Sequence, residues 1–96
     1  MSSPELNRGW HFLTSHSQVL LCLHRDPEVR LRDVAATVGI TERATQRIVA
    51  DLVLAGYVSR QRIGRRNRYS VDTELRMRHP AQQNHQIAQL LDLLEL

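Results

Sequence analysis

The sequence predicts a mainly helical α+β domain, in which short helices pack around a modest core and one small β-hairpin projects from them. Three observations lead to this class. Residues typical of helix starts and stops flank four apolar segments. Between residues 57 and 71, aromatic and β-branched residues alternate with polar ones, as in strands. The chain has 96 residues, 42% of them apolar, which is the size of a single domain.

A first helix is predicted around the longest apolar run, residues 19–23. Ser15 and Gln18 form an S-x-x-Q pattern, which favours Ser15 as the N-cap. The helix must end before Pro27, because proline disfavours helical backbone at the preceding residue. Residues 28–31 are expected to form a short strand.

Two further helices are predicted on either side of a tight turn. The first covers residues 32–38, and Gly39 suits the left-handed backbone that ends a helix. Thr41 is expected to cap the second, over residues 42–55, with Glu42 at the positive end of its dipole. A short helix, a glycine, an apolar turn residue and a threonine cap have the spacing of a helix-turn-helix.

An arginine-rich hairpin is predicted next. Residues 57–63 and 68–71 are its expected strands, joined by a loop over residues 64–67. All 13 basic residues of the chain are arginines, and residues 57–78 hold seven of them against two acidic residues. A positive charge confined to one segment is typical of a surface that meets a polyanion.

The end of the chain is apolar. Pro80 is expected to begin a last helix, because proline is favoured at the first helical position. A chain end with a continuous apolar stripe is unlike the exposed surface of a small monomer. The stripe has the spacing i, i+3, i+4, i+7 and consists of Ile87, Leu90, Leu91 and Leu94.

The helix-turn-helix spacing is followed by Arg47, Leu52, the run Ala55-Gly56-Tyr57-Val58, and then Arg60, Gly64-Arg65 and Tyr69. This string resembles the winged helix-turn-helix of the MarR and ArsR families of bacterial regulators, over roughly residues 15–71. It is most similar to the small actinobacterial type that carries one wing and a short C-terminal helix. The resemblance implies a flexible segment 1–9, a DNA-binding domain 10–78 and a dimerisation helix within 79–96.

Double-stranded DNA is therefore the expected partner. The second helix of such a motif lies in the major groove, where arginine suits guanine, glutamine suits adenine and glutamate can accept from cytosine. The residues of this helix expected to contact DNA are Thr41, Glu42, Arg43, Gln46 and Arg47. Arg43, Gln46 and Arg47 are the ones expected to contact bases, and Thr41 is expected to have a phosphate or cap role. The hairpin, or wing, is expected to meet the DNA backbone or minor groove through Arg62, Arg65, Arg66 and Arg68, with weaker backbone contacts from Arg30 and Arg32.

A homodimer is expected as well, since the resemblance implies dimerisation through terminal helices. The residues expected in the interface are Trp10, Phe12, Ile87, Leu90, Leu91 and Leu94. In the alternative, the last helix folds back on its own domain. Leu54 falls on the exposed stripe of the third helix, where it either covers the base of the hairpin or contacts a partner.

The expected function is a sequence-specific transcription regulator that binds an inverted repeat, with repression by promoter occlusion as the default outcome. A protein-interaction winged helix and a metal- or ligand-sensing regulator remain alternatives. No metal, cofactor or enzymatic activity is expected, because the histidines lack ligand spacing and no catalytic arrangement stands out. The lone Cys22 and the absence of a signal peptide or apolar span suggest a cytoplasmic protein.

Overall fold

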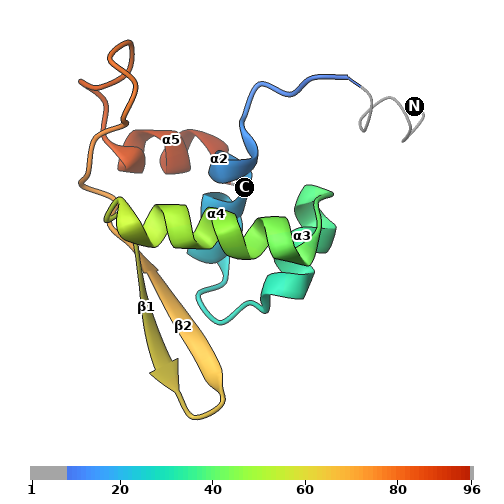
Figure 1. Cartoon of the computed structure of the whole chain (residues 1–96). Helices are drawn as coiled ribbons and strands as arrows, with labels where there is room; N and C mark the ends of the chain where they lie inside the picture. The colour runs from blue at the N-terminus through green and yellow to red at the C-terminus, as the bar shows by residue number, and fades with distance from the viewer. Residues whose placement is uncertain (1–8, 96) are drawn as a thin grey trace.

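Four helices and one antiparallel hairpin make up the part of the chain that the computed structural model describes, residues 9–95 (Figure 1). This is the mainly helical α+β class predicted from the sequence. The predicted flexible segment, residues 1–9, lies outside the described residues except for Gly9. The elements are α2 (Ser15–Arg25), α3 (Leu31–Val38), α4 (Glu42–Leu54), β1 (Val58–Ile63), β2 (Arg66–Val71) and α5 (Ile87–Leu94).

Helix α2 is the centre of the hydrophobic core. It packs against α3 and α4, and its Leu23 is fully buried next to Val34 and Val49 of those helices. Thr45 is also fully buried on α4, where its hydroxyl donates to the main-chain oxygen of Thr41 at 2.9 Å. Because this polar group has a partner, its burial carries little penalty.

The turn between α3 and α4 forms as predicted. Gly39 takes left-handed backbone with φ 86°, and its N–H donates to the Ala35 oxygen at 2.8 Å. The Thr41 hydroxyl accepts from the Ala44 N–H at 3.0 Å, which confirms Thr41 as the N-cap of α4. The start of α4 is therefore determined by residues close to it in the sequence.

The predicted start of α2 is wrong by one residue. Thr14, not Ser15, is the N-cap, and its hydroxyl accepts from the Ser17 N–H at 3.2 Å. Thr14 has the extended backbone that a cap requires, whereas Ser15 is already helical. The S-x-x-Q pattern therefore lies inside the helix and does not cap it.

The predicted strand at residues 28–31 is absent from the described structure. Pro27 and Glu28 form a turn, in which the Asp26 carboxylate accepts from the Glu28 N–H at 3.1 Å. One main-chain hydrogen bond, from the Tyr69 N–H to the Pro27 oxygen at 2.8 Å, ties this turn to β2. α3 then begins at Leu31, so the chain has no length left for a strand.

The hairpin is longer and its turn tighter than predicted. Val58 pairs with Val71 at the base and Ile63 with Arg66 at the tip, which leaves a turn of Gly64 and Arg65 alone. Gly64 has φ 62° in the first central position, as a type II′ hairpin turn requires. Arg66 and Asn67, expected in the loop, belong to β2.

The last helix begins at Ile87, not at Pro80. Main-chain bonds from the Ile87 N–H to the Leu75 oxygen at 2.8 Å, and from the Met77 N–H to the His85 oxygen at 3.0 Å, hold residues 85–87 in extended pairing. This pairing, formed with residues distant in sequence, prevents an earlier helix. α5 lies on the opposite side of α4 from the hairpin (Figure 1). Among the described helices, none has the length and apolar character needed to cross a membrane.

Candidate nucleic-acid interface

The outward face of α4 carries the predicted reading residues. Arg43, Gln46 and Arg47 are exposed, and within residues 9–95 their side chains make no hydrogen bond or ion pair. Glu42 is exposed in the first turn, while the Thr41 hydroxyl is engaged in the cap. The opposite face is buried in the core and consists of Thr45, Ile48, Val49 and Leu52.

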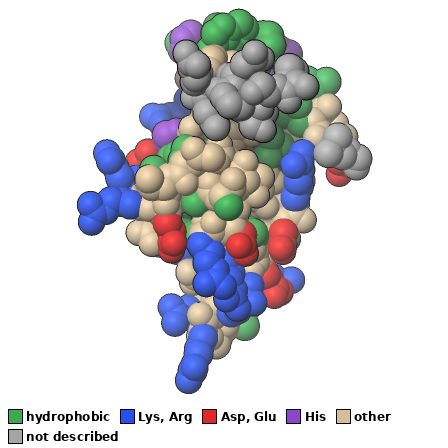
Figure 2. Space-filling view, turned by 90° about the vertical axis from the view of Figure 1, so that its right-hand side faces the viewer, with side chains coloured by type: hydrophobic (Ala, Val, Ile, Leu, Met, Phe, Trp, Pro, Cys, Tyr) green, Lys and Arg blue, Asp and Glu red, His purple; other side chains and the backbone are tan. Residues whose placement is uncertain are grey.

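The hairpin presents arginines along its length. Arg65 stands in the turn, and Arg66 and Arg68 alternate along β2 with the buried Tyr69. The Nε of Arg62 donates to the Gly64 oxygen at 3.0 Å, so this side chain lies along the tip. Figure 2 shows arginine side chains, in blue, down to the tip of the molecule, with acidic side chains beside them.

Glu28 contacts two of these arginines, which the sequence did not reveal. Arg66 donates to its main-chain oxygen, and the Nε of Arg68 lies 3.9 Å from its carboxylate. Glu28 is 38 to 40 positions away in sequence from these partners, and it was interpreted as part of a strand. No local pattern could have identified it, because the contact depends on how the turn packs against β2.

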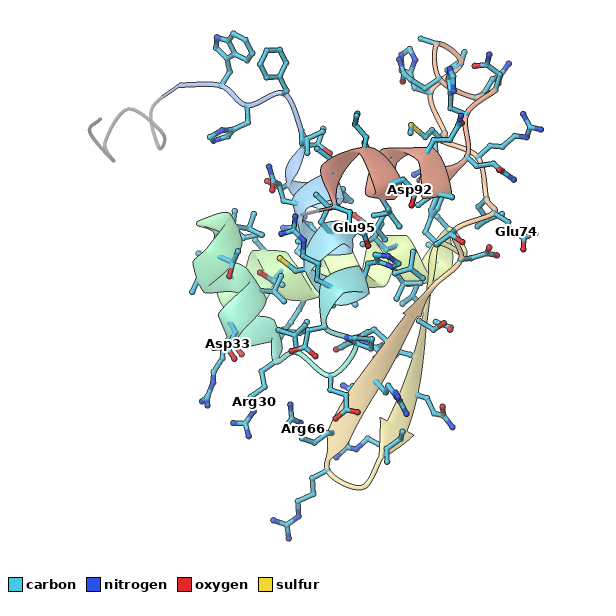
Figure 3. The ribbon with its side chains drawn as sticks, turned by 180° about the vertical axis from the view of Figure 1, so that it is seen from behind. Arg30, Asp33, Arg66, Glu74, Asp92 and Glu95 are labelled. Carbon is cyan, nitrogen blue, oxygen red and sulfur yellow. The ribbon has the colours of Figure 1, made fainter. Side chains whose placement is uncertain are left out.

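A groove of about 410 Å³ separates the start of α3 from the hairpin. Arg30 and Arg66 both line it, and Figure 3 shows the two side chains at this end of the molecule, between α3 and the hairpin. Arg32 is exposed on the first turn of α3. Of the two weaker backbone candidates, Arg30 therefore lies beside the wing.

The opposite end of the molecule carries acidic side chains. Glu74, Asp92 and Glu95 lie on the α5 side in Figure 3, away from Arg30 and Arg66. A polyanion approaching the hairpin end would therefore meet arginines, and these three acidic side chains lie far from its path.

The residues expected in a dimer interface divide into two groups. Ile87 and Leu91 are buried in the core of their own chain, and Leu94 packs against that core. Leu90 is half-buried. The expectation of a free apolar stripe is therefore corrected: α5 folds back on its own domain, where Arg25 donates to the Leu94 oxygen at 3.2 Å.

Trp10 and Phe12, in contrast, are exposed on the segment before α2. Their side chains are 77% and 92% exposed, and the rings stack edge to face with centroids 5.0 Å apart. Leu54 is 90% exposed, so it does not cover the base of the hairpin. In residues 9–95 no group of three metal-binding side chains comes together.

Comparison with known proteins finds likeness in structure but not in sequence. No protein-family model matches the chain, and no curated protein matches it. MepR, a transcription regulator of the Staphylococcus aureus multidrug efflux pump MepA, is similar in structure with a TM-score of 0.54 and 16% identity, over 73% of this chain and 52% of that chain. The chain thus spans about half the length of that regulator. Together with the helix-turn-helix and its hairpin, this likeness shows that the chain has a winged-helix fold.

Proposed function

We propose that this chain is a sequence-specific DNA-binding transcription regulator of the MarR- or ArsR-like kind. One observation carries the proposal: Arg43, Gln46 and Arg47 share an exposed face of α4 and have no partners within residues 9–95. Exposed arginines without ion-pair partners on a helix-turn-helix are suited to a nucleic acid. The likeness to a regulator of known structure supports the same conclusion.

In this proposal α4 enters the major groove. Its 13 residues extend for roughly 20 Å, which is enough to follow the groove over several base pairs. Arg43 and Arg47 would each present a planar fork to the O6 and N7 atoms of guanine, and Gln46 would pair with adenine. These contacts would supply the sequence preference.

The wing would supply affinity that does not depend on sequence. Arg65 at the turn, with Arg62, Arg66 and Arg68 behind it, would contact phosphates on one side of the groove. Arg30, which lines the groove beside the wing, and Arg32, exposed on the first turn of α3, would make weaker contacts with the DNA backbone. Each such contact makes binding more sensitive to salt, because it releases counterions from the DNA.

A homodimer would place two copies of α4 about one helical turn of DNA apart, roughly 34 Å, on an inverted repeat. The exposed Trp10 and Phe12 are the proposed dimer contacts, together with the half-buried Leu90 and Leu94 of α5. A dimer seated over a promoter would exclude the polymerase, so repression is the proposed outcome.

The test begins with selection of bound fragments from genomic DNA by the purified protein, followed by sequencing. Arg43→Ala and Arg47→Ala should each cost about 1–3 kcal/mol on the selected site and relax the preference at one base pair. Arg65→Ala should weaken selected and random duplexes alike. Arg78→Ala, in the connection before α5, is the control arginine and should change neither. Failure of the purified protein to bind any duplex at low salt would refute the proposal.

A further inference from the structure

The turn before α3 holds the wing in place through one acidic residue. Glu28 accepts a hydrogen bond from Arg66 through its main-chain oxygen, and its carboxylate lies 3.9 Å from the Nε of Arg68. The adjoining Pro27 oxygen accepts from the Tyr69 N–H at 2.8 Å. Two of these three contacts use main-chain oxygens, so they persist when the Glu28 side chain changes.

The Glu28 carboxylate is also an anion at the edge of a cationic groove. Together with Arg30, Arg65 and Arg66 it lines the groove between α3 and the hairpin. Its charge opposes any approach of a second anion to that groove. Main-chain contacts alone could anchor the wing, so the carboxylate is not required for that role.

We propose that the Glu28 carboxylate occupies, in the free protein, the position that a DNA phosphate takes beside Arg68 in the complex. This inference rests on the proposed DNA-binding function and goes beyond it. Glu28 is then a positioning residue: its carboxylate holds the Arg68 side chain nearby in the free protein and reduces the affinity for DNA of any sequence. Because this competition acts on every sequence alike, it lowers the overall affinity for DNA and leaves the ratio of specific to random binding unchanged.

The contact between Arg68 and Glu28 is weak enough for a DNA phosphate to replace the carboxylate. The Arg68 and Glu28 side chains are 56% and 59% exposed, and their atoms are 3.9 Å apart, beyond ordinary hydrogen-bond length. Exposed pairs of this kind are weak and screened by salt. A duplex carries a phosphate charge every 1.7 Å or so of its axis, so it can replace a single carboxylate.

The experiment measures binding of a fluorescent random-sequence duplex of about three helical turns, by anisotropy, across a series of salt concentrations. Glu28→Gln keeps the shape of the side chain and removes its charge. We expect it to tighten binding at low salt by about two- to fivefold per subunit, the range for one exposed ion pair that no longer competes. The gain should shrink as the salt concentration rises, because salt screens the exposed ion pair that competes with the DNA.

Glu74→Gln is the matched control. It makes the same change in net charge on the α5 side of the molecule, away from Arg66 (Figure 3). Its gain in affinity at low salt should be smaller than that of Glu28→Gln, because it frees no arginine in the wing. A Glu28→Gln result equal to that of Glu74→Gln would reduce the effect to net charge and overturn the inference.

The pair is tested directly by combining Glu28→Gln with Arg68→Gln. When Arg68 is already replaced, the second substitution should bring no gain in affinity beyond that of Glu74→Gln. If Glu28→Gln instead weakens binding, the carboxylate is needed to hold the wing, and the inference is wrong. Wild-type protein that binds no duplex would refute the proposed function itself, whereas wild-type binding without a specific gain in Glu28→Gln would refute this inference alone.

Discussion

Two leucines on α4, two positions apart, have opposite surroundings. Leu52 is 8% exposed and belongs to the core, whereas Leu54 is 90% exposed on the outward face. Because a residue on a helix turns by about 100° per position, two positions reverse its direction. The difference decides what each side chain contributes to folding.

Substitution of each leucine by alanine should therefore have very different effects on the free energy of unfolding. Leu52→Ala should lower the free energy of unfolding by about 2–5 kcal/mol, because it leaves a cavity in the core. Leu54→Ala should stay within about 0.5 kcal/mol of wild type. Urea unfolding followed by circular dichroism measures both. A large loss in Leu54→Ala would show that this side chain is covered in solution, for example by a second copy.

Cys22 gives a residue-scale prediction with a definite pH dependence. Burial raises the pKa of its thiol, and the nearby Arg25 guanidinium offsets part of the rise. Deprotonation is thus harder in the folded protein than in the unfolded chain. The stabilisation that results is complete below the unfolded pKa, about 8.5, and is lost as the pH rises through it towards the folded value.

Alkylation by iodoacetamide under reducing-agent-free conditions checks this prediction. At a pH near 8.5, Cys22 of the native protein should react more slowly than in urea, because only the thiolate reacts. The unfolding free energy of Cys22→Ala should fall less than that of wild type between about pH 8 and pH 10. Equal alkylation rates in the native and unfolded protein would contradict the assignment.

At the scale of elements, the features predicted correctly depend on local interactions. Gly39 and Thr41 act through bonds to residues three or four positions away, so their roles can be seen in the sequence. The strand at residues 28–31 was wrong because a local turn and the start of α3 occupy those residues, and the helix start at Pro80 was wrong because residues 85–87 pair with residues 75–77. Local preference could not reveal those partners.

The N-cap of α4 yields a prediction at this scale. Thr41→Ala removes the acceptor for the Ala44 N–H, and the free energy of unfolding should fall by about 0.5–2 kcal/mol. Thr41→Ser keeps the hydroxyl and should recover most of that loss. Thermal unfolding by circular dichroism distinguishes the two. Equal stability of the alanine and serine variants would mean that the cap does not stabilise α4.

At the scale of the whole molecule, the part of the candidate interface that lies on a single helix could be predicted from the sequence. Arg43, Gln46 and Arg47 share a face through helical spacing alone, and the structure leaves that face exposed. Glu28 escaped prediction because its position beside β2 exists only in the folded chain. The burial of Ile87 and Leu91 was predicted only as the alternative, since an apolar stripe can face its own core or a partner.

The proposed dimer gives the last prediction. Trp10 is the only tryptophan of the chain and is 77% exposed, stacked on Phe12. If these rings form the contact between subunits, dilution should shift the fluorescence emission of Trp10 to longer wavelength as the dimer dissociates and water reaches the indole. Phe12→Ala should move this transition to higher protein concentration, because it removes an aromatic contact at the centre of the proposed interface.

Ile63→Ala removes another exposed apolar side chain, on the hairpin, and should leave the transition in place. Sedimentation velocity on the same samples must show the change in mass that accompanies the shift. A dimer that persists in Phe12→Ala, with Trp10 emission independent of dilution, would locate the interface elsewhere on the molecule.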